Sequence, residues 1–439
     1  MERISLYNRL KQIIATHLYR NALYLMLDMV IKSGLGFIFW IIAARFYTAA
    51  DVGFSSAIFS VVGLLASLSL LGLDISIVRF LPRIKKTANL INTSFTLGGT
   101  VNLAVAVVFL AGLKLWAPRL TFIADSAMFI SVFLLFSLTL ISIQLMDHVF
   151  IAKRKAEFTL ATNSVVSLLK IPLLIFFAMF WHSFGIIASL ALASGIAISV
   201  AIFIFLPRAK IAYRPIPAVD TTMIKRMWGY SSSNYLANLF SAAPFFLLPL
   251  MVLNLLGPTE NAYYYVARMM VNSLFIISLA VSYSLFAEGS HSEEKLRENV
   301  VRAFKFTILL LVPALVLFIF AGKWLLFLFG YSYYVNALPL LQILAISALP
   351  QTVIHIYCTI LRVNHRIREL IIIWALASGI LLGSSYFAVP LLGIVGIGYT
   401  HLGTHCLLAI YVFVRKNSMW RKPAAEPASL DFLEDIKTS

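Results

Sequence analysis

Residues 52–86 read VGFSSAIFSVVGLLASLSLLGLDISIVRFLPRIKK and combine the two features that decide the fold. The apolar part, 52–80, contains a single carboxylate, Asp74, and it ends where basic residues begin. The hydrocarbon core of a bilayer is about 30 Å thick, and a helix needs roughly 20 residues to cross it. The stretch therefore predicts a membrane-spanning helix that ends at a basic loop. The basic residues of this loop are Arg79, Arg83, Lys85 and Lys86.

The same alternation of long apolar runs and short polar segments repeats along the 439 residues of the chain. Hydrophobic residues make up 61% of the sequence and charged residues 12%, with a mean hydropathy of +0.92. In a soluble globular domain these shares are nearer about half and about a quarter. We therefore predict an all-α polytopic membrane protein with about 12 transmembrane helices. The candidate spans are 21–45, 52–80, 89–112, 126–150, 159–181, 185–206, 228–254, 260–287, 304–328, 335–361, 369–389 and 393–415.

Lysine and arginine residues are concentrated in every second gap between these spans. Of the 35 basic residues, 27 lie in the terminal segments and in alternate gaps, whereas the intervening gaps hold four. Because basic loops stay on the cytoplasmic side, the chain should cross the cell membrane an even number of times, with both termini in the cytoplasm. This topology, together with contacts to membrane lipids, accounts for the formal charge of +17, so we expect no nucleic-acid partner.

The spans form two sets of six, separated by the longest basic loop. Both sets begin on the cytoplasmic side, so an internal duplication would relate them by a pseudo-twofold axis normal to the membrane. Similar polar turns open the second and eighth spans, at 48–57 and 258–267. The predicted units are an interfacial amphipathic segment or frayed lead-in (1–20), an N-terminal six-helix lobe (21–206), a cytoplasmic linker (207–227), a C-terminal six-helix lobe (228–415) and a disordered cytoplasmic tail (416–439).

Three cations fall deep within predicted spans, where an ionised side chain costs about 2.5–3.5 kcal/mol. Lys32 follows Asp28 by one helical turn, so the two could form a local ion pair. Lys170 is close to Pro172, and its amine could instead bond carbonyl groups that the proline frees. Arg268 has no carboxylate one turn away, and an unpaired guanidinium suits phosphate recognition. Three deep cations against one deep carboxylate indicate that the interior favours an anion.

Other polar residues in the spans are candidates for supporting roles. Asp74, Arg79 and Asp147 lie within a few turns of the predicted cytoplasmic end and are expected, with Asp28, to act in coupling or gating. The seventh span carries Asn234, Tyr235 and Asn238 among several serines, as in a helix that lines a cavity or packs against polar neighbours.

The sequence lacks the motifs of common cofactor and metal sites. No phosphate-binding loop, dinucleotide fingerprint or metalloprotease motif is present. His401 and His405 lie on one helical face, but two histidines make no zinc site without a third ligand. Between the remaining interpretations, we favour packing against polar neighbours over a role in proton sensing. We expect no metal, no cofactor and no enzymatic activity.

Two stretches resemble a known family: 36–53, which reads GFIFWIIAARFYTAADVG, and 71–82, which reads LGLDISIVRFLP. They resemble the polysaccharide (O-antigen type) flippases of the multidrug/oligosaccharidyl-lipid/polysaccharide exporter superfamily. The resemblance implies two six-helix bundles around a V-shaped central cavity, lined largely by spans 1, 2, 7 and 8. It would place Lys32, Arg268 and the polar face of span 7 at that cavity, and Lys170 less securely.

These observations lead to the hypothesis that the protein flips an isoprenoid-diphosphate-linked glycan precursor from the inner to the outer leaflet. Lys32 and Arg268, with Lys170 as a further candidate, would hold the diphosphate. Asn234, Tyr235 and Asn238 would meet the sugars. Glycan polymerase or assembly proteins would be partners.

Three alternatives and the coupling mode stay open. A cation-coupled drug exporter of the same fold would need carboxylates in the cavity. A membrane glycosyltransferase or ligase is disfavoured by the short external gaps, and a scramblase or lipid-binding role is also open. Coupling to H⁺, to Na⁺ or to the membrane potential alone is not decided by the sequence.

Overall fold

The computed structural model describes residues 17–415 apart from 85–86, 182, 212 and 292–295. The described chain is helical, and twelve of its helices are long and apolar enough to cross a membrane. The spanning helices are α2 (His17–Phe46), α3 (Ala49–Leu70), α5 (Thr87–Ala111), α7 (Ala127–Ala152), α8 (Ala156–Ala178), α9 (Ser183–Val200), α11 (Thr221–Leu255), α12 (Pro258–His291), α13 (Leu296–Phe329), α14 (Tyr331–Val363), α15 (Ile367–Leu392) and α16 (Val395–Val414). The shorter elements are α4 (Leu73–Phe80), α6 (Leu113–Trp116), the 3₁₀ helix η1 (Pro118–Ile123), the π-helical turn η2 (Ala201–Phe205) and α10 (Leu206–Arg208).

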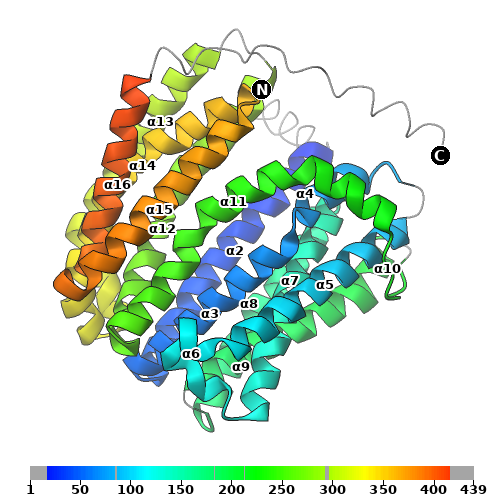
Figure 1. The fold of residues 1–439 in the computed structure, drawn as a ribbon, viewed down its shortest axis with the longest axis horizontal. Coiled ribbons are helices and arrows are strands. Elements are labelled where there is room, and N and C mark those ends of the chain that lie inside the picture. Colours follow the sequence, from blue (N-terminus) through cyan, green and yellow to red (C-terminus); the bar gives the residue numbers. More distant parts are fainter. Residues whose placement is uncertain (1–16, 85–86, 182, 212, 292–295, 416–439) are drawn as a thin grey trace, which may run out of the picture.

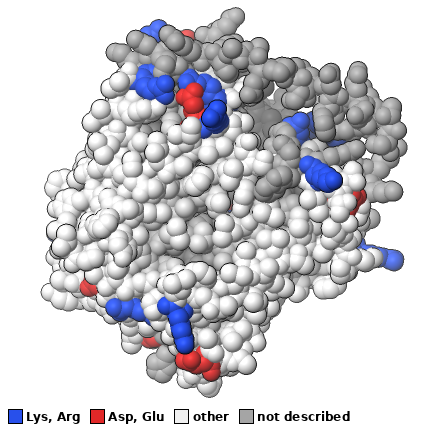
Figure 2. All heavy atoms as spheres, in the orientation of Figure 1, with Lys and Arg blue, Asp and Glu red and all other residues white. Residues whose placement is uncertain are grey.

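The predicted all-α polytopic fold with twelve spans is confirmed, and the helices form two lobes of six (Figure 1). In the N-terminal lobe α2 packs on α8 and α7 on α9, and in the C-terminal lobe α14 packs on α12, α13 and α16. Figure 2 shows charged side chains along two opposite edges of the molecule, with a broad uncharged band between them. This band is what a protein surrounded by lipid requires.

The opening stretch of the sequence is not one straight span, so that prediction is wrong at its basic end. Helix α3 ends at Leu70, and Leu71 and Gly72 both adopt positive φ, at 48° and 76°. A side-chain carbon at Gly72 would lie 2.6 Å from Cβ of Ser231 in α11, so only glycine fits this turn. The chain resumes as α4, which therefore stands against the second lobe.

Helix α2 begins and α16 ends at the same end of the bundle, which we call the basic end because the basic loops connect the helices there (Figure 1). At the opposite end the two lobes are in close contact through α3 and α12. A side-chain carbon at Gly53 of α3 would lie 1.7 Å from the carbonyl oxygen of Pro258, so the two helices meet backbone to backbone. Asn261 adds hydrogen bonds from Nδ2 to the Gly53 carbonyl (2.7 Å) and to Oγ of Ser56 (3.1 Å).

The predicted linker is shorter than expected, because Asp220 caps α11 and starts that helix at Thr221. The segment before it is bonded to α5, where Asn92 donates to the carbonyl of Arg214 (3.1 Å) and accepts from the amide of Ile216 (3.3 Å). Of the predicted amphipathic segment only its last residues fall inside α2, since 1–16 lie outside the described residues, as does the predicted tail 416–439.

Candidate functional site

A cavity of about 470 Å³ lies where α2 of the first lobe faces α12 and α13 of the second. Among the described residues that line it, Lys32 is the one charged side chain, and Ser33, Asn272 and Ser273 supply neutral polar groups. The remaining lining residues are Gly34, Gly36, Phe37, Trp40, Met269, Met270, Ile276, Phe318 and Leu325. We call this space the Lys32 cavity.

Lys32 lies between two carboxylates. Its Nζ is 2.9 Å from Oδ2 of Asp28, one turn earlier on α2, and 3.9 Å from Oδ2 of Asp147 on α7. The Lys32 side chain is 43% exposed, whereas the two acidic side chains are 5% and 14% exposed, so the ammonium faces the cavity and the carboxylates stand behind it. The predicted Asp28–Lys32 pair is therefore present.

Asp147 lies in the same cluster as Asp28 and Lys32. Both of its carboxylate oxygens accept hydrogen bonds from Nδ2 of Asn163 on α8, at 3.2 and 3.1 Å. Asn163 thus fixes the carboxylate in place against Lys32. With two carboxylates and one ammonium, the cluster has a formal charge of −1 when all three groups are ionised. The sequence did not predict that Asp147 is a second carboxylate near Lys32.

Arg268 lies on a different face of α12, away from the Lys32 cavity. Its Nη1 is 3.2 Å from Nε2 of His401 on α16, and its guanidinium stands 4.9 Å from the centre of the Phe275 ring. Among the described residues its Nε has no hydrogen-bond acceptor. Because arginine can only donate, His401 accepts through Nε2, and its Nδ1–H then donates to Oγ of Ser347 at 2.9 Å.

The structure therefore separates Lys32 from Arg268, which the sequence placed at one site. Met269, next to Arg268 on α12, does line the Lys32 cavity, whereas Arg268 is not among the lining residues. Sequence reasoning also missed His401 as the partner of Arg268, since the two residues are far apart in the chain. His401 and His405 stack at 4.2 Å, and the described residues contain no group of three metal-ligating side chains.

The other predicted substrate residues are dispersed. Lys170 on α8 is buried, with its Nζ 5.3 Å from the centre of the Phe39 ring. Tyr235 on α11 donates to the carbonyl of Leu68 in the first lobe at 2.9 Å, and Asn234 is half-buried beside it. Asn238 accepts from Nη2 of Arg362 at 3.4 Å.

The predicted gating residues Asp74 and Arg79 lie on α4 at the basic end, where both are half-buried. The guanidinium of Arg79 lies 5.9 Å from the centre of the neighbouring Phe80 ring. Helix α4 contacts α11 through Ser76 and Ser231, whose Oγ atoms are 2.6 Å apart. These residues therefore stand at a contact between the two lobes.

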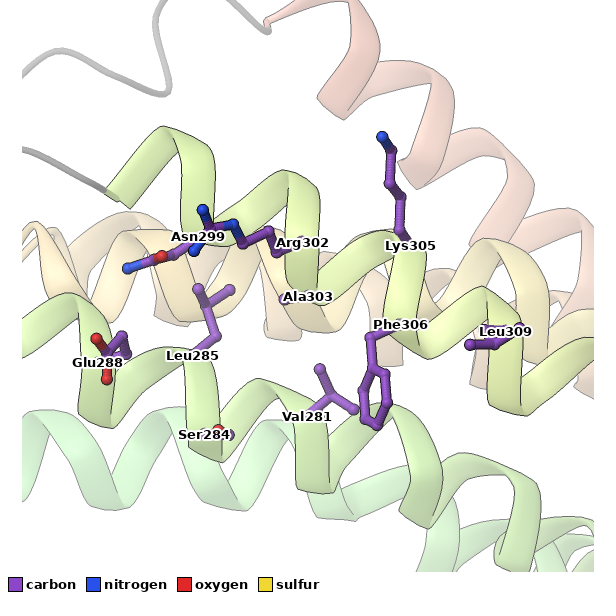
Figure 3. Close-up of a pocket in the computed structure, with 10 residues that line it drawn as sticks. All are labelled: Val281, Ser284, Leu285, Glu288, Asn299, Arg302, Ala303, Lys305, Phe306 and Leu309. Carbon is purple, nitrogen blue, oxygen red and sulfur yellow. The ribbon is translucent and has the colours of Figure 1, made fainter.

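Two further hollows lie along α12. One, of about 250 Å³, is inside the second lobe between α11, α12, α14 and α15. The other, of about 590 Å³, lies between α12 and α13 near the basic end (Figure 3). In Figure 3 the side chain of Arg302 extends toward Asn299, whereas Lys305 points away from α12. Arg302 also pairs with Glu298 at 2.5 Å, so its charge is already balanced on α13 itself.

Comparison with known proteins identifies the architecture. The sequence model described as "Polysaccharide biosynthesis protein" matches residues 42–337. No curated protein matches the chain. The fold is similar to that of the lipid II flippase MurJ in an inward closed conformation, with a TM-score of 0.71, 12% identity, and coverage of 91% of this chain and 89% of that one.

Two further solved structures are similar. An inward-facing multidrug resistance MATE family transporter of the MOP superfamily gives a TM-score of 0.67 at 13% identity, covering 92% of this chain and 100% of that one. A MOP superfamily transporter from Pyrococcus furiosus, described as having a binding pocket of reverse polarity, gives 0.63 at 14% identity, covering 92% and 95%. At these identities the likeness establishes the fold alone.

Proposed function

Because the chain belongs to the polysaccharide biosynthesis protein family, we propose that it moves an isoprenoid-diphosphate-linked oligosaccharide or polysaccharide precursor across the cell membrane, from the cytoplasmic to the outer leaflet. One observation carries the proposal: Lys32 is the charged residue among those described around the Lys32 cavity, and its ammonium faces that space. An anionic group could bind in this cavity by taking the ammonium from Asp28 and Asp147, and no carboxylate is among the described lining residues.

The proposed binding step is an exchange of partners at Lys32. Without substrate, the ammonium is neutralised by Asp28 and Asp147. A diphosphate would compete for the same ammonium with charge-assisted hydrogen bonds. Once Lys32 turns to the ligand, two carboxylates remain in a low-dielectric site, where taking up a proton or Na⁺ is favoured. Asp28 and Asp147 would thus couple substrate binding to a cation.

The proposed transport step is a rocking of the two lobes about the end at which Asn261 bonds Gly53. The contacts at the basic end would then break and re-form, among them the bond from Tyr235 to the Leu68 carbonyl. In another conformation Arg268 would leave His401 and become a second phosphate ligand, since Met269 beside it already lines the cavity. Asp74 and Arg79 would act at the α4–α11 contact as gating residues.

In this proposal the membrane potential can drive transport without a chemical reaction, so no enzymatic activity is needed. With both termini cytoplasmic, outward movement of an anion is favoured by roughly 2.3 kcal/mol per charge for each 100 mV of potential. Membrane lipids would surround the isoprenoid tail, and glycan polymerase or assembly proteins would receive the product.

A second candidate function is favoured by a specific observation. Asp28 and Asp147 stand directly behind the cavity cation, and a cation-coupled exporter of small molecules needs such carboxylates. If Lys32 turned away from them, the same site would present negative charge. The two functions therefore differ in whether the ligand takes the ammonium or the carboxylates.

The deciding experiment uses purified protein in liposomes that carry a fluorescent isoprenyl-diphosphate hexose. Loss of leaflet asymmetry, measured by quenching from outside, is expected with the wild type. Arg268→Ala should abolish this movement while membrane insertion stays intact. Lys323→Ala should not, because it removes an exposed cation that contacts Trp324 and is not among the residues that line the Lys32 cavity. Wild-type flipping by the Arg268 variant would exclude Arg268 as a phosphate ligand. Export of a cationic dye together with no lipid movement would establish the second function instead.

A further inference from the structure

The smaller hollow inside the second lobe contains unpartnered polar groups. It measures about 250 Å³ and lies between α11, α12, α14 and α15. Three atoms of its lining are buried and, among the described residues, have no hydrogen-bond partner: Oγ of Ser282, Oε1 of Gln351 and Nε1 of Trp374. The three residues are only 4%, 9% and 8% exposed. Buried polar groups normally have partners, so three orphans around one space indicate a ligand that bonds them.

The chemistry of the lining defines what that ligand can be. Ser282 can donate or accept, Gln351 offers an acceptor, and the indole of Trp374 offers a donor and a flat apolar face. Nε2 of Gln351 lies 3.2 Å from Nε2 of His355; the amide nitrogen can only donate, so His355 accepts. Arg362 is the one side chain with a permanent charge among the described lining residues, and Asn238 already accepts from it.

We propose that this cavity is a saccharide subsite that holds one sugar ring of the glycan, an inference that rests on the proposed function. A pyranose ring presents hydroxyl groups at its edge and C–H groups on its faces, which match alternating donors and acceptors beside an indole. The volume is below the about 300–1,000 Å³ of pockets that hold a whole drug-sized ligand, so it suits one unit of a larger molecule.

Helix α12 connects this subsite to the Lys32 cavity. Asn272 and Ile276 line the Lys32 cavity, and Leu279 and Phe286 line the subsite, on successive turns of one helix face. The rise from Asn272 to Ser282 is about 15 Å along the helix, toward the basic end. A ligand with its diphosphate at Lys32 would therefore extend a sugar into the subsite along a single wall.

The test compares two probes that differ only in the sugar: farnesyl diphosphate, and farnesyl diphosphate with one hexose attached, with glucose, galactose and N-acetylglucosamine each tried. Binding to the full-length protein in lipid nanodiscs is measured by titration calorimetry. For at least one of the three hexoses, the wild type should bind the glycosylated probe about tenfold more tightly than farnesyl diphosphate. Ser282→Ala and Gln351→Leu should remove this advantage and leave affinity for farnesyl diphosphate unchanged. Trp374→Phe, which keeps a ring, should remove part of it.

Two matched controls lie on the same helices. Ser284→Ala changes a serine on α12 that lines the hollow of Figure 3, and Gln342→Leu changes a glutamine on α14 that bonds the carbonyl of Ile319. Both controls should keep the sugar advantage. A third variant, Lys32→Met, should weaken both probes alike, because it acts on the diphosphate.

The outcomes separate the two proposals. Equal affinity of the wild type for farnesyl diphosphate and for every glycosylated probe would overturn the subsite, and so would an advantage that survives in Ser282→Ala and Gln351→Leu. The first result would mean that the protein does not recognise the sugar, and the second that the sugar is recognised outside this cavity. If Lys32→Met binds farnesyl diphosphate as the wild type does, the proposed function fails at its phosphate site, whatever the sugar variants show.

Discussion

In the N-terminal lobe, Lys32 lies 2.9 Å from one carboxylate and 3.9 Å from another, whereas in the C-terminal lobe Arg268 bonds a histidine at 3.2 Å. The first cation is neutralised by acids on its own and a neighbouring helix. Because Arg268 can only donate, it holds His401 as a neutral acceptor, so its own charge is not compensated by that contact. The two lobes thus keep the cations of their spanning helices in different electrostatic states.

The difference assigns different tasks to the two cations. A cation between carboxylates can exchange them for an anionic ligand, and the carboxylates it leaves can bind a cation in turn. A cation that contacts a neutral histidine stays uncompensated. It can therefore form an ion pair with an anionic ligand that comes close to it. Breaking either arrangement, or converting one into the other, tests the assignment.

Of the four changes compared below, removing the cation of the N-terminal lobe should have the largest effect on flipping. Lys32→Met leaves Asp28 and Asp147 facing a cavity without an ammonium, so we predict a loss of flipping of about 100-fold or more, equivalent to about 2.7 kcal/mol. Thermal unfolding should also move to lower temperature, because the two carboxylates lose their counter-charge.

The double variant Lys32→Met/Asp28→Asn separates stability from transport. It removes one uncompensated carboxylate, so its unfolding temperature should return toward that of the wild type while flipping stays absent. Recovery of flipping in the double variant would show that Lys32 serves only to balance the charge of Asp28. The role assigned to Lys32 in ligand binding would then be wrong.

The sequence predicted the parts of this contrast that are local in the chain. The twelve spans were readable because each apolar run is long enough for a bilayer, and Asp28 was readable as a partner of Lys32 because the two are one turn apart. Asp147 and His401 were not, since each comes from a helix distant in sequence from its cation. The break at Leu71–Gly72 was also hidden, because the close approach of Ser231 in α11 creates it. Pairing between helices is the information that hydropathy and spacing do not contain.

Giving Arg268 in the C-terminal lobe a carboxylate partner, as Lys32 has in the N-terminal lobe, should have an intermediate effect on flipping. His401→Glu would place a carboxylate against Arg268 and fix the guanidinium there, so we predict about tenfold slower flipping together with a higher unfolding temperature. His401→Gln keeps a neutral acceptor and should flip within about twofold of the wild type. Wild-type flipping by the glutamate variant would show that Arg268 never has to leave position 401.

Lys170 should show the smallest effect, and it tests whether a buried cation matters by its charge or by its position. Its amine lies over the Phe39 ring within the N-terminal lobe, and it is not among the residues that line the Lys32 cavity. Lys170→Met should therefore change flipping by less than about twofold and raise the unfolding temperature slightly, because an apolar chain replaces a desolvated ammonium. Lys170→Arg is the matched control: it keeps the charge but forces a larger head group toward Gly36, so it should lower stability. A tenfold loss of flipping in Lys170→Met would place this lysine on the substrate path, and the N-terminal lobe would then hold an uncompensated cation of the kind found in its partner.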